Sequence, residues 1–358
     1  MAQGKVYILA IESSCDDTSC AVLENDVLLA NITANQTIHE QYGGVIPELA
    51  SRDHQKNIVP TVHAALEKAG VNLSQISAIA FTRGPGLMGS LLVGASFAKS
   101  LSLAMGIPLI EVNHMQAHIL AHFIRFGVRS SELIEEDSGK PFTNSQLPTP
   151  NFPFLCLTVS GGHTQIVKVK DHLQFELIGQ TVDDAVGEAF DKAAKILGLP
   201  YPGGPLIDKH AQHGDPAKFS FSKSKVPGLD YSFSGIKTSF LYFIQNSVKA
   251  DATFIEKNLD DICASYQHHL VKVLLHNLTE AAKLHNIHQI AIAGGVSANS
   301  ELRKQLKETG NKLNWNVFIP PFEFCTDNAA MIAIVGYHKF LKQEFCDLSA
   351  VPQARYSL

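Results

Sequence analysis

The stretch Val6-Tyr7-Ile8-Leu9-Ala10-Ile11-Glu12-Ser13-Ser14-Cys15-Asp16-Asp17-Thr18 is an apolar strand that ends in a polar turn, after which the chain continues as a second strand to Leu23. The same order recurs from Phe154 to Val169, around the turn Ser160-Gly161-Gly162-His163-Thr164. Each predicted hairpin opens one half of the chain and is followed by alternating helices and strands. This pattern predicts a duplicated α/β architecture with a cleft between its halves.

The segments after each hairpin support this interpretation. In the first half the patterns predict a strand over 76–81, a turn at Thr82-Arg83-Gly84-Pro85-Gly86, a helix over 87–105 and a strand over 108–112. In the second half they predict a helix over 182–197, a rigid turn at Tyr201-Pro202-Gly203-Gly204-Pro205, a helix over 259–284, a strand over 290–293 and a final helix over 327–342.

Domain boundaries follow from a change in composition. Residues 128–153 are acidic and rich in proline, serine and asparagine, which is typical of a mobile linker loop. We therefore expect an N-terminal lobe over 1–127 and a C-terminal lobe over 154–345, with the final helix packing back on the N-terminal lobe.

Composition limits the class of protein. The chain has 358 residues, of which 45% are hydrophobic, enough for two packed domains. Its net charge of -5 argues against a protein that mainly binds nucleic acid unaided and without specificity. No stretch approaches the roughly 18 apolar residues of a membrane span, and no signal peptide is apparent. The six cysteines form no CxxC pair, so we expect reduced thiols in a soluble, cytoplasmic protein that has no membrane partner.

Two histidines stand four residues apart in Asn113-His114-Met115-Gln116-Ala117-His118. On a helix, residues at this spacing share one face, so both imidazoles can bind one cation at about 2.1 Å. From the motif alone, two histidines hydrogen-bonded in a core are the more ordinary explanation. A metal site also needs a further ligand.

Asp327 is the candidate for that ligand, although it stands where a helix-capping residue is also expected. In Cys325-Thr326-Asp327-Asn328 a cap uses one polar side chain and leaves another free. A carboxylate beside two histidines makes an open site of mixed nitrogen and oxygen ligands, suited to Fe²⁺ or Zn²⁺.

Glycine-rich turns are the second candidate feature. Ser160-Gly161-Gly162 and Gly294-Gly295 let the backbone approach a ligand and turn several N–H groups toward an anion, as any tight hairpin also allows. Gly84 and Gly89 have the spacing of a P-loop, but Ser90 replaces its lysine, so we expect a tight turn before a closely packed helix. Asp184, Glu188 and Asp191 share one helix face, which ordinary ion pairs of Glu188 with Lys192 and of Asp191 with Lys195 explain as a solvated face.

In combination, the motifs of this chain resemble those of the bacterial TsaD family, formerly called Gcp, over nearly the whole length. The motifs are Glu12 to Thr18, Gly43 to Arg52, His114-x-x-x-His118, Ser160 to Thr164, Gly187 to Lys192, Tyr201 to Pro205, Phe233 to Lys237 and Gly294 to Asn299. The resemblance implies an actin-like α/β fold of the sugar-kinase superfamily (ASKHA), duplicated in two domains around a central nucleotide cleft. It also implies an enzyme that transfers a threonylcarbamoyl group to the adenosine 3′ of the anticodon, in tRNAs that read codons beginning with A.

The resemblance also assigns residues and partners. It implies that His114, His118 and Asp327 hold a metal, with Fe²⁺ expected before Zn²⁺. It also implies that the donor is threonylcarbamoyl-AMP, made by a separate synthase. A paralogous partner, TsaB, and an ATPase, TsaE, are implied as well. Asp16, Ser160 and His163 are the expected catalytic residues, with Asp16 assisting proton removal and the amides of Ser160-Gly161-Gly162 stabilising the oxyanion or the phosphate. The expected donor-binding residues are Thr158, Val159, Ser160, Gly161, Gly162, Asp191, Gly204, Asp208 and Asn299.

Three alternatives remain at this point. A zinc endopeptidase would use the same histidines, but Met115 stands where its glutamate base belongs. A non-catalytic nucleotide-binding scaffold would have little use for three metal ligands. A sugar kinase is conceivable on the fold alone, and a fold does not assign a reaction.

Overall fold

The computed structural model describes residues 4–126, 148–222 and 226–358, which form two compact units. Unit 1 comprises Met1–Thr149, Asp171–Phe175 and Pro320–Leu358, and unit 2 comprises Pro150–Lys170 and Glu176–Ile319. Residues 320–358, which include the expected final helix, belong to unit 1. Most of the predicted linker over 128–153 lies outside the described residues.

Unit 1 is built on a sheet of order β5-β4-β1-β2-β3-β6. Its central hairpin is antiparallel, β4 pairs with β1 in parallel, and β5 pairs with β4 in parallel. The strands are β1 (Tyr7–Glu12), β2 (Thr18–Glu24), β3 (Val27–Ala34), β4 (Ala78–Gly84), β5 (Leu109–Asn113) and β6 (Arg125–Phe126). The helices are α1 (Pro47–Ala69), α2 (Met88–Met105), α3 (His114–Leu120) and α9 (Ala329–Leu341).

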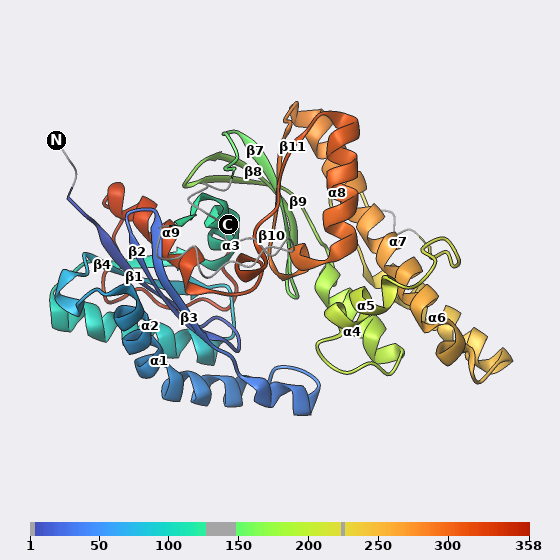
Figure 1. Cartoon of the computed structure of the whole chain (residues 1–358), viewed down its shortest axis with the longest axis horizontal. Coiled ribbons are helices and arrows are strands. Elements are labelled where there is room, and N and C mark those ends of the chain that lie inside the picture. Colours follow the sequence, from blue (N-terminus) through green and yellow to red (C-terminus); the bar gives the residue numbers. More distant parts are fainter. Residues whose placement is uncertain (1–3, 127–147, 223–225) are drawn as a thin grey trace. The chain divides into compact units, whose positions relative to one another are not determined.

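The two faces of this sheet are covered by different helices, as side-chain alternation along a strand requires. Leu9 and Ile11 of β1 pack in a core with α1 and α2, whereas Ile8 and Ala10 pack in a second core with α3 and α9. Helix α9 therefore lies on the strands of the N-terminal hairpin although it comes from the other end of the chain (Figure 1).

Unit 2 repeats this plan with a sheet of order β11-β10-β7-β8-β9. Strands β7 and β8 are antiparallel, β10 pairs with β7 in parallel, and β11 pairs with β10 in parallel. The strands are β7 (Phe154–Val159), β8 (Thr164–Asp171), β9 (Gln174–Gln180), β10 (Gln289–Ala293) and β11 (Asn316–Phe318). The helices are α4 (Val186–Ile196), α5 (Gly203–Ala211), α6 (Ser234–Ala250), α7 (Phe254–His285) and α8 (Ser300–Leu313).

Both predicted hairpins are confirmed, and so is the duplicated α/β architecture. Helix α5 corrects one detail, since it begins at Gly203, inside the stretch 201–205 that the sequence predicts to be a turn. The predicted P-loop-like segment is a tight turn against a closely packed helix, because a Cβ on Gly86 would lie 2.4 Å from the carbonyl oxygen of Ser14.

The expectation that no segment resembles a membrane span is wrong for one helix of the described residues. By length and composition alone, α2 is apolar enough to cross a membrane. In unit 1 its residues Ala95 and Ala98 pack in the core that α1 also covers. All six cysteines are free thiols.

Candidate metal centre and ligand pocket

Three side chains of unit 1 meet at the end of its sheet. His114 and His118 lie on α3, which directly follows β5, and Asp327 lies just before α9. Asn113 caps α3, since its side chain accepts hydrogen bonds from Met115 N and Gln116 N. The cap of α9 is Asn328, whose side chain accepts from Met331 N, so the Asp327 carboxylate is free to face the histidines.

The ligand atoms of these three residues form a nearly equilateral triangle. The two Nε2 atoms are 3.1 Å apart, and Oδ1 of Asp327 is 3.3 Å from each of them. Ligands around one cation at about 2.1 Å lie about 3.0–3.4 Å apart in octahedral or tetrahedral geometry. The residues therefore fit a divalent metal. Asp327 has a side-chain exposure of 28% and is the most exposed of the three.

Glu12 supports this triangle from behind. It ends β1, is fully buried, and accepts hydrogen bonds from Ser14 N and from the hydroxyl of Thr82. Its Oε2 is 3.2 Å from Nδ1 of His114, and the hydroxyl of Ser14 is equally close to that nitrogen. Carboxylates often hold a metal-bound histidine in this way, fixing the ring and its tautomer. Nδ1 of His118 is buried and has no hydrogen-bond partner among the described residues.

The charged groups at this site favour the binding of one cation. Burial lowers the pKa of His114, but the carboxylates of Asp327 and Glu12 outweigh burial and hold that pKa well above its usual value. Burial raises the pKa of Asp327, and His114 outweighs that effect and lowers it. Burial lowers the pKa of His118. Two anions thus surround one imidazolium, whose proton a metal ion would replace.

The turn that carries the expected base Asp16 lies between β1 and β2 in the same unit. A buried histidine on α1 holds this turn: His54 Nδ1 is 2.7 Å from the hydroxyl of Thr18, and its Nε2 is 3.0 Å from the carbonyl oxygen of Cys15. The hydroxyl of Ser90 on α2 donates to the same carbonyl. Asp16 itself is partly buried.

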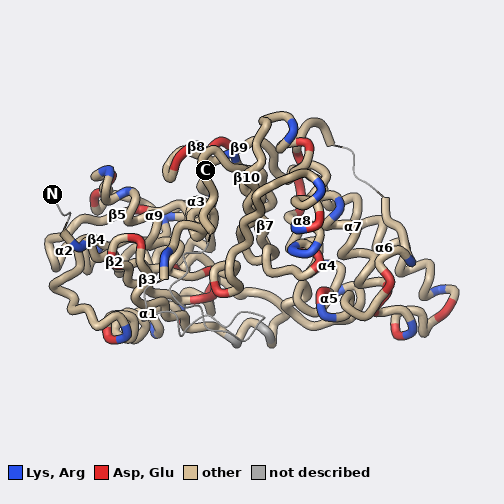
Figure 2. Tube along the Cα trace, turned by 45° about the horizontal axis from the view of Figure 1, so that its top comes forward, with Lys and Arg blue, Asp and Glu red and all other residues tan. Residues whose placement is uncertain are grey.

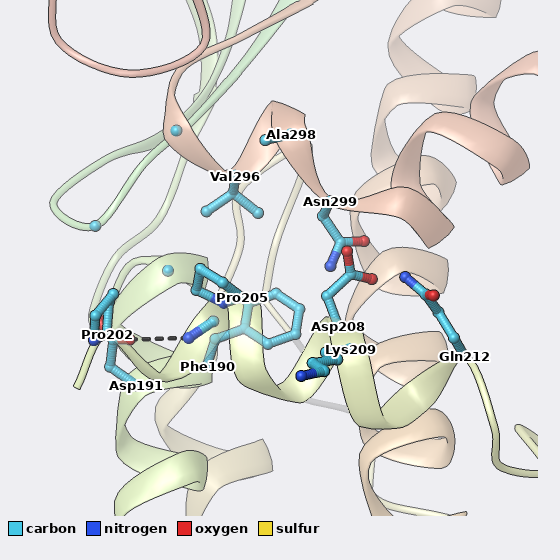
Figure 3. Close-up of a pocket in the computed structure, with 14 residues that line it drawn as sticks. Phe190, Asp191, Pro202, Pro205, Asp208, Lys209, Gln212, Val296, Ala298 and Asn299 are labelled. Atoms are coloured by element: carbon cyan, nitrogen blue, oxygen red, sulfur yellow. Dashed lines mark hydrogen bonds between the residues drawn. The ribbon is translucent and has the colours of Figure 1, made fainter. Parts of the chain in front are cut away.

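Unit 2 contains a cavity of about 310 Å³. In Figure 3, Phe190 of α4, Pro205 of α5 and Val296 form apolar walls, and the polar side chains of Asp208 and Asn299 lie together at one side. The full lining is Gly161, Gly187, Phe190, Asp191, Pro202, Gly204, Pro205, Asp208, Lys209, Gln212, Gly295, Val296, Ala298 and Asn299.

Asp191 lies on the rim of this pocket, which contradicts the interpretation of its helix face as solvated. Its Oδ1 accepts hydrogen bonds from Gly203 N at 2.9 Å and from Gly204 N at 3.2 Å (the latter dashed in Figure 3). A carboxylate at the first amides of α5 stabilises the start of that helix. Burial raises the pKa of Asp191 despite these two bonds. Asp184 is also largely buried, between Lys192 and Lys237, whereas Glu188 makes the predicted pair with Lys192.

The expected donor-binding residues fall into two groups. Five of them line the pocket, namely Gly161, Asp191, Gly204, Asp208 and Asn299. The other four, Thr158, Val159, Ser160 and Gly162, do not. Thr158 and Val159 are fully buried at the end of β7.

Ser160 and His163 interact through the backbone of their turn. The Ser160 hydroxyl accepts from His163 N at 3.1 Å, and Ser160 N donates to the carbonyl oxygen of His163. These bonds close the turn between β7 and β8. They are not contacts between a side-chain nucleophile and a side-chain base.

Sequence reasoning did not assign several residues that the structure brings to these sites. Glu12 and Ser14 belong to the metal centre, and Phe190, Lys209 and Gln212 belong to the pocket. A signal for Glu12 was present, because a carboxylate that ends an apolar strand is buried and needs a partner. No comparable sequence signal marks Lys209 or Gln212.

The chain matches a family model described as TsaD, tRNA N6-adenosine threonylcarbamoyltransferase, over residues 27–130 and 141–334. The tRNA N6-adenosine threonylcarbamoyltransferase of Christiangramia forsetii is 61% identical over 99% of both chains. That of Porphyromonas gingivalis is 54% identical, also over 99% of both chains. Both similarities extend over the pocket and the metal centre.

Solved structures share the fold. Full-length HypF in its phosphate- and nucleotide-bound form aligns with 93% of this chain and 46% of its own, at a TM-score of 0.58 and 13% identity. HypF from T.kodakarensis aligns with 95% of this chain and 48% of its own, at a TM-score of 0.57 and 13% identity. At this identity the likeness shows the fold alone, which agrees with the predicted duplicated α/β fold.

Proposed function

The chain belongs to the TsaD family of tRNA N6-adenosine threonylcarbamoyltransferases, and on that premise we propose how its two sites divide the reaction. The transfer joins a threonylcarbamoyl group to N6 of an adenosine in tRNA. We propose that the metal centre of unit 1 activates the carbonyl group of the donor, and that the pocket of unit 2 binds the adenylate part of the donor.

The observation that carries the proposal is the triangle of His114, His118 and Asp327. A divalent metal bound there would supply a Lewis acid that polarises the carbonyl oxygen of threonylcarbamoyl-AMP. Two imidazoles and one carboxylate suit Fe²⁺ first and Zn²⁺ second. The same histidines do not favour a metalloprotease, because Met115 is buried and carries no base.

Glu12 has a supporting role in this proposal. By accepting a hydrogen bond from Nδ1 of His114, it keeps Nε2 of that ring directed at Asp327 and increases the basicity of the ring. It is held in place itself by Ser14 and Thr82, so it can do so without moving.

The pocket of unit 2 suits a nucleoside monophosphate. Phe190, Pro205 and Val296 offer flat apolar surfaces to a base, while Asp208 and Asn299 offer an acceptor and a donor to polar groups of the nucleoside. Gly161, in the turn between β7 and β8, lets the backbone approach the ligand closely. The adjoining amides of Ser160 and Gly162 are proposed to stabilise the phosphate or the oxyanion.

In the chemical step the exocyclic amine attacks the donor carbonyl carbon, the bond from that carbon to the phosphate oxygen breaks, and AMP leaves. The amine must lose one proton. We assign the acceptance of this proton to Asp16, which is partly buried in the turn beside Glu12, in the unit that holds the metal ligands.

We further propose that the acceptor adenosine lies 3′ of the anticodon in tRNAs that read codons beginning with A, and that the protein acts in the cytoplasm. The donor would come from a separate synthase, and TsaB and TsaE would act as partners. Figure 2 shows both signs of charge along α8, where Arg303, Lys304 and Lys307 stand between Glu301 and Glu308 in the sequence. Such a mixed surface supports a contribution of partner subunits to tRNA binding.

Reconstitution tests the proposal. The chain, partner subunits, Fe²⁺, threonylcarbamoyl-AMP and unmodified tRNA are combined, and the digested tRNA is examined for threonylcarbamoyladenosine by nucleoside mass analysis. We expect product that depends on this chain and that Asp327→Asn abolishes. Undiminished product with Asp327→Asn would exclude the metal assignment. In a separate measurement of tRNA binding, full-strength binding by the chain alone would exclude a tRNA surface shared with partner subunits.

A further inference from the structure

A buried amide on α7 contacts two polar side chains of the unit 2 pocket. Gln267 is 3% exposed and is not among the residues that line the cavity. Its Nε2 donates to Oδ1 of Asp208 at 2.9 Å, and its Oε1 accepts from Nδ2 of Asn299 at 2.8 Å. One side chain from a third element therefore links a residue of α5 to the residue that caps α8.

The hydrogen-bond roles in this network are fixed at every position. The Asp208 carboxylate can only accept, so Gln267 must present its NH₂ group to it. Oδ1 of Asn299 accepts from Leu302 N at 3.0 Å, so the NH₂ group of Asn299 must face Oε1 of Gln267. Ser300 adds two donors to Asp208, its hydroxyl at 2.6 Å and its backbone N–H at 3.1 Å.

This arrangement leaves defined hydrogen-bonding capacity for a ligand. Asn299 keeps one amide hydrogen, and the Asp208 carboxylate keeps one acceptor position on Oδ2, which receives only the Ser300 N–H. Figure 3 shows both side chains at the same side of the pocket. If both bonds to Gln267 were lost, Ser300 would still hold Asp208 and Leu302 N would still hold Asn299. The two side chains would no longer be fixed relative to each other, and the pair would be less well preorganised for the ligand.

We propose that Gln267 is a positioning residue for the transfer reaction. Without touching the donor, it holds Asp208 and Asn299 in the orientation in which they bind the adenylate part of threonylcarbamoyl-AMP. This inference rests on the proposed assignment of the donor to the unit 2 pocket.

A positioning role predicts a specific kinetic result. The adenylate contacts are remote from the carbonyl carbon and are equally strong before and during the transfer, so weakening them raises KM for the donor and leaves kcat unchanged. Gln267→Leu keeps a similar volume but removes both hydrogen bonds. We expect donor KM to rise about 10-fold or more, with kcat within about twofold of the natural chain.

Gln267→Glu makes donor KM depend on pH in a way that a loss of stability would not produce. When protonated, the introduced carboxyl group accepts from Asn299 and donates to Asp208, as the amide does; when ionised, it repels Asp208. Donor KM of this variant should therefore fall toward the natural value as the pH is lowered from about 8 to about 5.5. Around position 267, the titratable group in direct contact is Asp208. Lys209 lines the same pocket, and the neighbouring His268 is paired with Glu301 at 3.0 Å.

The assay measures threonylcarbamoyladenosine formation by the full-length chain with its partner subunits, at saturating tRNA and varied threonylcarbamoyl-AMP. Asn277→Leu is the matched control, because Asn277 is also an α7 amide but donates to the carbonyl oxygens of Leu229 and Asp230, and it does not line the pocket. Its donor KM should stay at the natural value. Circular dichroism establishes that each variant is folded, and if Gln267→Leu is not, the pH series of Gln267→Glu decides.

Asp208→Ala and Asn299→Ala separate the positioning role from the location of the donor. If both raise donor KM while Gln267→Leu and Gln267→Glu do not, the positioning role of Gln267 is wrong although the donor site is right. If neither raises it, the donor does not bind in this pocket, and the inference fails with that assignment. If Asn277→Leu raised donor KM as much as Gln267→Leu does, the effect of Gln267→Leu would reflect a loss of stability of α7, and the positioning role would be wrong.

Discussion

His118 and His114 are equivalent in the sequence motif but not in their surroundings. Nδ1 of His114 faces Glu12 and Ser14, whereas Nδ1 of His118 has no hydrogen-bond partner among the described residues. His118 is thus held mainly by packing on α3 and by its contacts with His114 and Asp327. Its removal disturbs fewer polar contacts than the removal of His114 would.

His118→Ala should therefore remove the metal and leave a folded protein. We expect bound metal to fall from about one equivalent to near zero and product formation to be lost, because two remaining ligands bind a divalent ion weakly. Metal analysis after gel filtration and nucleoside mass analysis measure the two effects. Natural turnover in the folded variant would mean that His118 is not a ligand.

Glu12→Gln tests the supporting carboxylate at nearly constant volume. The neutral amide cannot stabilise the His114 ring as an anion does, so we expect about a 10–100-fold loss of metal affinity. Competition with a coloured chelator measures it. Glu24→Gln is the matched control, since Glu24 lies on β2 and pairs with Lys5 and Tyr7. Equal metal affinities for both variants would remove Glu12 from the site.

Glu323 gives unit 1 a pH-dependent stability. Burial raises the pKa of this carboxyl group to about 7, and its Oε1 has no hydrogen-bond partner among the described residues. The folded state therefore binds the proton more strongly than the unfolded state. The stability contributed by protonated Glu323 is lost as the pH rises from about 4.5 through about 7.

Glu323→Gln should abolish that loss. We compare the Tm of the variant with the Tm of the natural chain at each pH. The variant should gain in this comparison between pH 5 and pH 8, and each kcal/mol of gain corresponds to about 2–4 °C in Tm. Glu344→Gln, at an exposed position, should show no such pH-dependent difference. A Tm difference for Glu323→Gln that is the same at both pH values would contradict the assignment of this pH dependence to Glu323.

Individual site residues were only partly predictable from the sequence. Asp327 had two explanations that spacing cannot separate, and only the structure shows Asn328 as the cap. Asp191 was ambiguous because an i,i+4 partner, Lys195, was available, yet its carboxylate binds the amides of Gly203 and Gly204. These partners are 12 and 13 residues away, beyond the reach of helix-face arguments.

Among the elements, the strand-to-turn junctions decide the local geometry. Gly294, between β10 and the short helix over Gly295–Ala298, has φ of 88° and ψ of 168°, a region of backbone conformation that is open almost only to glycine. A Cβ there would also lie 2.4 Å from the carbonyl oxygen of Val159. The end of β7 and the end of β10 therefore approach each other as closely as backbones allow.

Gly294→Ala should destabilise unit 2 by about 2–4 kcal/mol, from backbone strain and the steric clash together. Gly295→Ala is the neighbouring control, because a Cβ on Gly295 would have no atom within 4 Å and the φ of this residue is ordinary. Chemical denaturation measures both. Equal midpoints for the two variants would refute the close approach.

Elements with a strong pattern were predicted well, and their ends were not. The long helix expected over 259–284 is α7, Phe254–His285, and the final helix expected over 327–342 is α9, Ala329–Leu341. The start of α5 at Gly203 was missed, because a proline followed by two glycines usually indicates a turn. In the structure the Asp191 carboxylate accepts hydrogen bonds from the amides of both glycines at the start of the helix. Local sequence does not contain that long-range bond.

Across the whole molecule, five strands of each sheet follow the same order, and the sheet of unit 1 has β6 in addition, beside β3. In both, a hairpin supplies the central strand and its neighbour, a later strand pairs with the central strand in parallel, and one more strand pairs in parallel with that later strand. The hairpins alone were sufficient to predict the duplication. The exact division into units was less predictable, because Asp171–Phe175, inside the expected C-terminal lobe, also belongs to unit 1.

The dependence of the transfer on a metal is measured most directly by titrating metal-free protein with Fe²⁺ in the reconstituted system. We predict that threonylcarbamoyladenosine formation is absent without metal, rises in proportion to added Fe²⁺, and saturates at about one equivalent per chain. Natural turnover in the metal-free protein would contradict a metal-dependent transfer.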